Sequence, residues 1–220
     1  MIYASLNDQR VMSGSVSIPW YGAPVADVVL ADDLSFASTV ASLVVADLTL
    51  AMSIVRAASF AGSRSARLVG GMGGWIGQCQ SRAYDNPSGV LAQTVLGDLA
   101  AEVGETVAVT GVGPLGTSWV RAAGQACTAL ALVAGSLWWI DPTGVTQVGT
   151  PRSSLPIASV FTVIGYSGGT GLYTIATESL ADWAPGRTFV APTVDGVRTV
   201  QYVRHQINRD GIVRTEVLAR

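Results

Sequence analysis

The stretch that decides the fold is residues 199–213, which read Thr199-Val200-Gln201-Tyr202-Val203-Arg204-His205-Gln206-Ile207-Asn208-Arg209-Asp210-Gly211-Ile212-Val213. β-Branched and aromatic residues recur through its first nine positions, as is typical of a strand. The Asp-Gly pair that follows favours a tight hairpin between two strands. We therefore expect the chain to end in antiparallel strands.

Both outer sections of the chain share this β character. Residues 151–220 and residues 1–83 contain short extended segments separated by glycine-rich or proline-rich turns, so we expect strands in both. Within the first section, residues 9–30 read as an edge-rich β region because Pro19 and Pro24 interrupt regular pairing.

The middle section, residues 84–150, has helical patterns instead. Apolar residues fall at helical spacing over 88–103, with a proline before this run and a glycine after it, and again over about 118–133. Residues 138–146 then resemble a hairpin, because a proline and a glycine stand where a type I turn accepts them.

This order predicts an α+β fold with two small β-barrel domains and an inserted helix-helix-hairpin module. The first β-barrel region is residues 1–83, the helical insertion with its β-hairpin is residues 84–150, and the second β-barrel region is residues 151–220. The two outer regions have similar lengths, which permits an origin by internal duplication.

The composition points to a surface that is covered by other subunits. Only 13% of the residues are charged and 49% are hydrophobic, whereas a soluble domain is typically about 25% charged. The formal charge of −2 and the absence of lysine argue against a nucleic-acid binder. The first residues show no basic segment followed by an apolar one, so we expect a protein made and kept in the cytoplasm.

Residues with reactive side chains are few and scattered. His205 is the only histidine, which leaves no second imidazole for a metal cluster or a Ser-His-Asp triad, and we expect it to be structural. Cys127 reads as a small core residue and Cys79 as a residue of a polar strand that could be exposed. Glu102 and Glu105 read as solvated charges near a helix end. We predict no catalytic residues, cofactor or metal.

One motif offers an enzymatic alternative. Residues 111–116 match G-x-G-x-x-G, follow a strand-like segment and precede a predicted helix, as in a dinucleotide-binding unit. However, Asp141 lies in a hairpin turn that leads to an antiparallel partner, and no further strand-helix alternation follows to build a parallel sheet. A flexible connector is the favoured interpretation.

A membrane helix is the other alternative that the sequence raises. The 19 residues between Arg121 and Asp141 are uncharged, which is long enough for a span. The run nevertheless includes Gly, Gln, Thr and Ser and ends in the strand-like segment 138–140, so we predict no stable membrane insertion.

The six tryptophans supply the candidate interface residues. Trp138 and Trp139 are consecutive in a predicted strand, so their side chains point to opposite faces and one of them needs cover from another domain or chain. Trp75 follows the glycine-rich run 70–74 and is the third candidate. Tryptophan is enriched at binding hot spots.

Several of these segments resemble one known protein family. The series 67–75, 84–90 and 95–105, together with Pro185-Gly186-Arg187 and the closing residues 203–217, is similar to tail or baseplate hub proteins of Mu-like and related tailed bacteriophages. In the last segment a histidine precedes a glycine and a threonine, as in the terminal hairpin of hub proteins.

The resemblance implies a structural virion protein of the phage tail rather than an enzyme. It implies a homotrimeric baseplate hub whose two barrels per chain give pseudo-sixfold symmetry, so that one face meets the hexameric tail tube protein and the other the trimeric central spike protein. Other baseplate or tail-tip proteins are further expected partners, and sequence-specific nucleic acid is not. A distal tail or tube-closing ring protein is the alternative.

Overall fold

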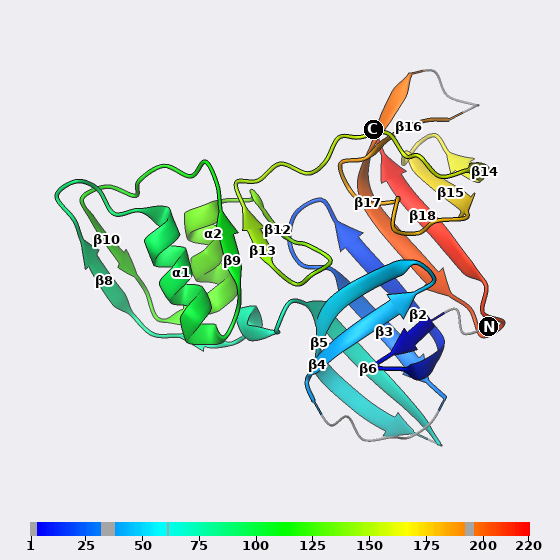
Figure 1. Ribbon diagram of the computed structural model, residues 1–220, viewed down its shortest axis with the longest axis horizontal. Helices are drawn as coiled ribbons and strands as arrows, with labels where there is room; N and C mark the ends of the chain where they lie inside the picture. The colour runs from blue at the N-terminus through cyan, green and yellow to red at the C-terminus, as the bar shows by residue number, and fades with distance from the viewer. Residues whose placement is uncertain (1–3, 32–37, 61, 192–195) are drawn as a thin grey trace.

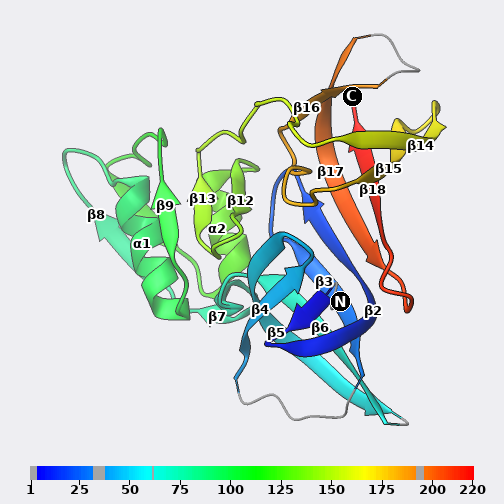
Figure 2. The ribbon, with the colours of Figure 1, turned by 45° about the vertical axis from the view of Figure 1, so that its right-hand side comes forward.

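The computed structural model describes residues 4–31, 38–60, 62–191 and 196–220, and it divides the chain into three parts. An N-terminal barrel and a C-terminal lobe of strands lie side by side, and a smaller module with both helices projects from them (Figure 1). The same arrangement is visible after rotation by 45° (Figure 2). In chain order, strands come first, the two helices follow among shorter strands, and longer strands come last.

The N-terminal barrel is a closed antiparallel sheet of six strands. Its members are β1 (Ala4–Leu6), β2 (Gln9–Pro19), β3 (Val25–Leu30), β4 (Val40–Val45), β5 (Leu48–Phe60) and β6 (Ser63–Gly70). They follow the order β1-β4-β5-β6-β3-β2, and pairing of β1 with β2 closes the ring. The expectation of an edge-rich region over 9–30 is wrong, because β2 pairs on both sides and places its prolines at or beyond its end.

The C-terminal lobe continues this sheet. Its strands are β14 (Phe161–Ser167), β15 (Leu172–Thr177), β16 (Thr188–Val190), β17 (Val197–Ile207) and β18 (Val213–Ala219). β17 pairs with β2 from Tyr202↔Pro19 to Ile207↔Gly14, which joins the lobe to the barrel. The predicted terminal hairpin is confirmed, since β17 and β18 pair across a turn in which Gly211 has a φ of +75°.

The lobe curls on itself but does not close through a strand ladder among the described residues. The order runs β17-β18-β15-β14, and β16 pairs with the beginning of β17. Only the isolated parallel bridge Pro156↔Thr188 links β16 to the segment that precedes β14. Aromatic side chains fill the centre, where the Phe161 and Trp183 rings lie 5.1 Å apart.

The inserted module consists of two α-helices, one 3-10 helix and seven short strands, which form three small sheets. They are η1 (Gly74–Ile76), β7 (Gln78–Cys79), β8 (Arg82–Asp85), α1 (Ala92–Val103), β9 (Val107–Val109), β10 (Ser118–Arg121), β11 (Gly124–Gln125), α2 (Ala126–Ala134), β12 (Trp138–Ile140) and β13 (Thr146–Val148). The first helix is confirmed, although α1 begins at Ala92 rather than at residue 88, and the β12–β13 hairpin is confirmed.

The second helix is shorter than predicted. α2 begins at Ala126, whereas the apolar pattern predicted a start near residue 118. Ser118–Arg121 instead forms β10, which pairs with β8 and brings the rings of Trp119 and Tyr84 to 6.1 Å between centroids. A strand partner more than 30 residues away in the sequence therefore overrides the local helical spacing.

Glu105 fixes the joint between the module and the barrel. Its carboxylate accepts hydrogen bonds from the backbone N–H groups of Met72 (3.1 Å) and Gly74 (2.7 Å). Gly73 adopts a φ of +81°, and a Cβ on Gly74 would collide with the backbone carbonyl oxygen of Val103, so the glycines are required here. The prediction of a solvated Glu105 is wrong: the residue is 7% exposed, and burial raises its pKa.

Candidate interface residues

The side chains that carry chemistry are held in structural contacts. His205 is fully buried, and its Nδ1 lies 3.0 Å from the Thr215 hydroxyl on the neighbouring strand. Cys79 is 1% exposed, so the expectation that it could be exposed is wrong, while Cys127 is half-buried. Within the described ranges, no group of three His, Cys, Asp or Glu residues is placed to hold a metal ion.

The G-x-G-x-x-G segment is a connector between two strands. Residues 111–116 join β9 to β10, so the segment does not open a helix. It pairs with residues before α1: Val90 N–H donates to Gly116 O (2.7 Å), and Leu115 N–H donates to Val90 O (2.8 Å). The helix N-terminus that would hold a pyrophosphate in a dinucleotide-binding unit is therefore missing at this loop.

The uncharged run 122–140 is divided among several elements of the module. It contains β11, α2 and β12, and α2 spans nine residues. In the part of the chain that the structure describes, no helix has both the length and the apolar content needed to cross a bilayer.

Trp75 belongs to the core of the module. It is 5% exposed, and its indole N–H donates to the Thr146 hydroxyl at 2.8 Å. That Trp75 lies in an interface stays a prediction. The side chain has little exposed surface with which to contact another subunit.

Trp138 and Trp139 lie on opposite sides of β12 and are both half-buried. Trp138 packs against the core of the module. Trp139 faces the junction of the three parts, where its indole N–H donates to Thr150 O (3.0 Å) and the Arg152 guanidinium lies 4.1 Å from its ring centroid. Their contact with another subunit remains a prediction.

Arg152 is a residue that the sequence analysis missed. Its Nε donates to Trp20 O (2.9 Å) and its Nη2 to Pro19 O (2.7 Å), so it ties the segment after β13 to the end of β2. Burial lowers its pKa to about 10, which still leaves it charged at neutral pH. A lone arginine beside Pro151 carries no sequence signal for this role.

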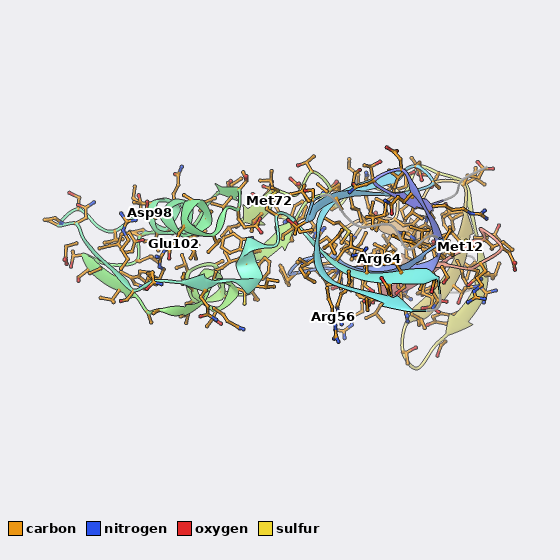
Figure 3. The ribbon with its side chains drawn as sticks, turned by 90° about the horizontal axis from the view of Figure 1, so that it is seen from below. Met12, Arg56, Arg64, Met72, Asp98 and Glu102 are labelled. Carbon is orange, nitrogen blue, oxygen red and sulfur yellow. The ribbon has the colours of Figure 1, made fainter. Side chains whose placement is uncertain are left out.

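Large apolar side chains are exposed on the module and on the C-terminal lobe. On the module they include Leu132 (72%), Val120 (62%) and Leu137 (55%). On the lobe they include Val160, Ile164, Val190, Val197 and Ile212, each more than half exposed. Asp98 and Glu102 lie close together on the module, and Arg56 lies far from them on the barrel (Figure 3). Exposed apolar area of this kind is typical of surfaces that contact other proteins.

Comparison with solved structures identifies the fold, although no protein-family model and no curated protein matches the chain. An Escherichia coli component of the type VI secretion system, described as similar to the T4 bacteriophage tail proteins gp27 and gp5, aligns with a TM-score of 0.72 and 12% identity, over 98% of this chain and 76% of that one.

Two tail proteins align over almost their whole length. The tail protein from Neisseria meningitidis MC58 gives a TM-score of 0.64 at 15% identity, over 98% of this chain and 95% of that chain. The 43 kDa tail protein of prophage MuSo2 from Shewanella oneidensis gives 0.65 at 10% identity, over 98% and 97%. The resemblance seen in the sequence is thus confirmed at the level of the fold: the chain has the fold of phage tail and baseplate proteins.

Proposed function

We propose that this chain is a structural protein of a tailed phage or a phage-like particle, and that it acts as the tail or baseplate hub. In this role three copies form a ring with pseudo-sixfold symmetry, which joins the hexameric tail tube to the trimeric central spike. The ring is a component of the virion tail and assembles in the cytoplasm of the host bacterium.

The observation that carries this proposal is a match in fold. In each of three comparisons, 98% of this chain aligns with a solved structure of a tail protein or of a type VI secretion component. The match includes the module as well as the strands, so it concerns the whole architecture rather than a common small barrel.

The arrangement of the strands supports a ring of three copies. Each chain has two β-rich parts that share the β2–β17 pairing, so three chains would present six such parts around an axis. A ring requires heterologous contacts, in which two different surfaces of the protomer meet. The exposed apolar residues on the module and on the C-terminal lobe provide two such surfaces.

The copy number in the intact particle tests the hub role. Electron cryomicroscopy of particles that carry an insertion tag in this chain should show three copies between tube and spike. Six copies in one ring would instead assign the chain to the distal tail or tube-closing position. Absence of the tag from the tail would refute both assignments.

Substitution of the paired tryptophans tests the predicted contact. We expect Trp139→Ala to reduce incorporation into particles more than it reduces thermal stability, because Trp139 lies at the junction of the three parts. Trp138→Ala should mainly lower stability, since this ring packs on the module core. Trp139→Phe is the matched control. Full incorporation of Trp139→Ala would remove this residue from the interface.

A further inference from the structure

A cavity of about 230 Å³ lies where the barrel, the β12–β13 hairpin and the loop before β16 meet. Its walls are mainly apolar. They include Ile18, Leu50, Trp139, Trp183, Arg152 and Arg187. No acidic residue lines it.

Two arginines face this cavity without a carboxylate to balance them. Among the described residues, no acidic oxygen lies within 4.0 Å of the guanidinium of Arg152 or Arg187, since the three ion pairs found there involve other arginines. Asp47, Asp141 and Asp182 flank lining residues in the sequence, but their carboxylates accept hydrogen bonds from other groups: Leu180 N–H, Val145 N–H and Ser159 N–H, respectively. Neither guanidinium therefore has a carboxylate in direct contact.

Arg152 retains donors after its structural hydrogen bonds are counted. A guanidinium has five N–H groups. Two of them bind Trp20 O and Pro19 O, and the face of the group stacks on the Trp139 ring. The remaining three have no acceptor among the described residues, and the stacking and the two hydrogen bonds hold the group in one orientation.

Trp183 forms part of the wall of the same cavity. The residue is 1% exposed, and its indole N–H has no hydrogen-bond partner in the described part of the chain. The ring packs against Phe161 and Phe189, so a change in the cavity next to it should be sensed at its N–H signal. Two arginine side chains thus line one mainly apolar cavity in which no acidic residue is present.

We propose that this cavity binds a carboxylate carried on a small apolar group. The arginines would hold the carboxylate by charge-assisted hydrogen bonds, and the aliphatic walls would enclose the apolar part. The volume lies below the roughly 300–1,000 Å³ of pockets for drug-sized ligands, which restricts the occupant to a group about as large as one side chain. This inference does not depend on the hub role.

Isovalerate and its neutral isostere isovaleramide are suitable probes. With protein labelled by ¹⁵N at the tryptophan indoles, titration with isovalerate should shift the Trp183 N–H signal in a saturable way and leave that of Trp75 unchanged. Isovaleramide should bind roughly tenfold more weakly or worse, because it lacks the charge. Equal binding of both probes would overturn the proposal. So would the absence of any shift at an isovalerate concentration roughly a hundred times a millimolar dissociation constant.

Variants locate the site. Arg187→Gln should weaken isovalerate binding by about tenfold, and Trp183→Phe, which removes only the N–H and the larger ring, by a smaller factor. Arg67→Gln is the matched control, since Arg67 is exposed on the barrel and far from the cavity lining. Thermal melting of each variant verifies folding. Unchanged affinity in folded Arg187→Gln would contradict the assignment.

The natural carboxylate could be a free acid or the carboxyl group of another protein chain, and size separates the two. N-acetylvaline and a tetrapeptide that ends in valine imitate a chain end, and their C-terminal amides are the controls. Binding of these peptides would indicate a protein carboxylate. Binding of isovalerate alone would indicate a free acid, which mass spectrometry of material released from the purified protein should then detect.

Discussion

The N-terminal barrel and the C-terminal lobe use the same antiparallel strands, but they are closed and filled differently. Strand ladders close the barrel completely, whereas in the described part of the lobe one isolated bridge links its ends. The barrel core is aliphatic and has many members, among them Leu43, Leu50 and Leu68. The lobe has a smaller core that depends on a few aromatic rings. We therefore expect many side chains to contribute a little each to the stability of the barrel, and a few aromatic rings to contribute most of the stability of the lobe.

The largest expected loss of stability follows from the lobe's dependence on a few aromatic rings. Trp183→Ala removes a buried ring that lies 5.1 Å from Phe161 and 5.3 Å from Phe189, so it should cost about 3–5 kcal/mol. Hydrogen exchange should show that β14 to β18 lose protection first while the barrel strands keep theirs. Leu43→Ala in the barrel is the control, and it should lower protection in the whole chain. Equal loss everywhere after Trp183→Ala would refute a separately stabilised lobe.

Local sequence signals predicted the parts of the fold that local chemistry determines. The Asp-Gly turn before β18, the helix α1 between a proline and a glycine, and the β12–β13 hairpin all depend on residues adjacent in the chain. The opposite orientations of Trp138 and Trp139 follow from the period of a strand in the same way.

Features that depend on distant partners could not be read from the sequence. Arg121 is 1% exposed, and its guanidinium is bound by Gln80 O and the Glu102 carboxylate across the module. The sequence around Arg121 indicates neither partner. Glu105 looked like a solvated helix-end charge because its partners are backbone N–H groups 31 and 33 residues away. Because every residue except proline has a backbone N–H, such a partner cannot be recognised from the residue types in the sequence.

The second prediction concerns the strand that the barrel and the lobe share. On β17, Ile207 packs in the barrel core, Val203 packs in the lobe core and His205 lies between them. Burial lowers the pKa of His205 from 6.5 to about 4, although the charge of Asp47 acts in the opposite direction. The folded protein thus resists protonation of this ring.

Because the pKa is lower in the folded state, the stabilising contribution is complete above pH 6.5 and is lost as the pH falls toward 4. The loss should reach roughly 3 kcal/mol, from about 1.4 kcal/mol per pH unit. His205→Gln should be less stable at pH 8 but have a flatter stability curve between pH 7 and 4.5. Denaturant titrations at several pH values measure both, and parallel curves for the two proteins would contradict the assignment.

The third prediction tests the joint that attaches the module. Glu105→Gln should cost about 1–3 kcal/mol, because an amide NH₂ would then face one of the two N–H donors of Met72 and Gly74. Since burial raises the pKa of Glu105, the difference should shrink as the pH rises through that pKa. Glu178→Gln, at an exposed position, is the control and should change stability by less than about 0.5 kcal/mol. Chemical denaturation measures both variants, and equal losses would exclude a special role for Glu105.

The smallest effect on stability, and a clear effect on association, should come from the open edge of the lobe. β14 pairs only with β15 among the described strands, and Ile164 on it is 57% exposed, so this edge can accept another strand or an apolar surface. Ile164→Lys should change the free energy of unfolding by at most about 0.5 kcal/mol. In sedimentation experiments it should reduce self-association, because charge on an edge strand opposes pairing. Val40→Lys is the matched control: Val40 is 41% exposed, but its strand belongs to the closed barrel, so association should persist. If the two variants associate equally, the open edge at β14 is not the surface through which the protein associates.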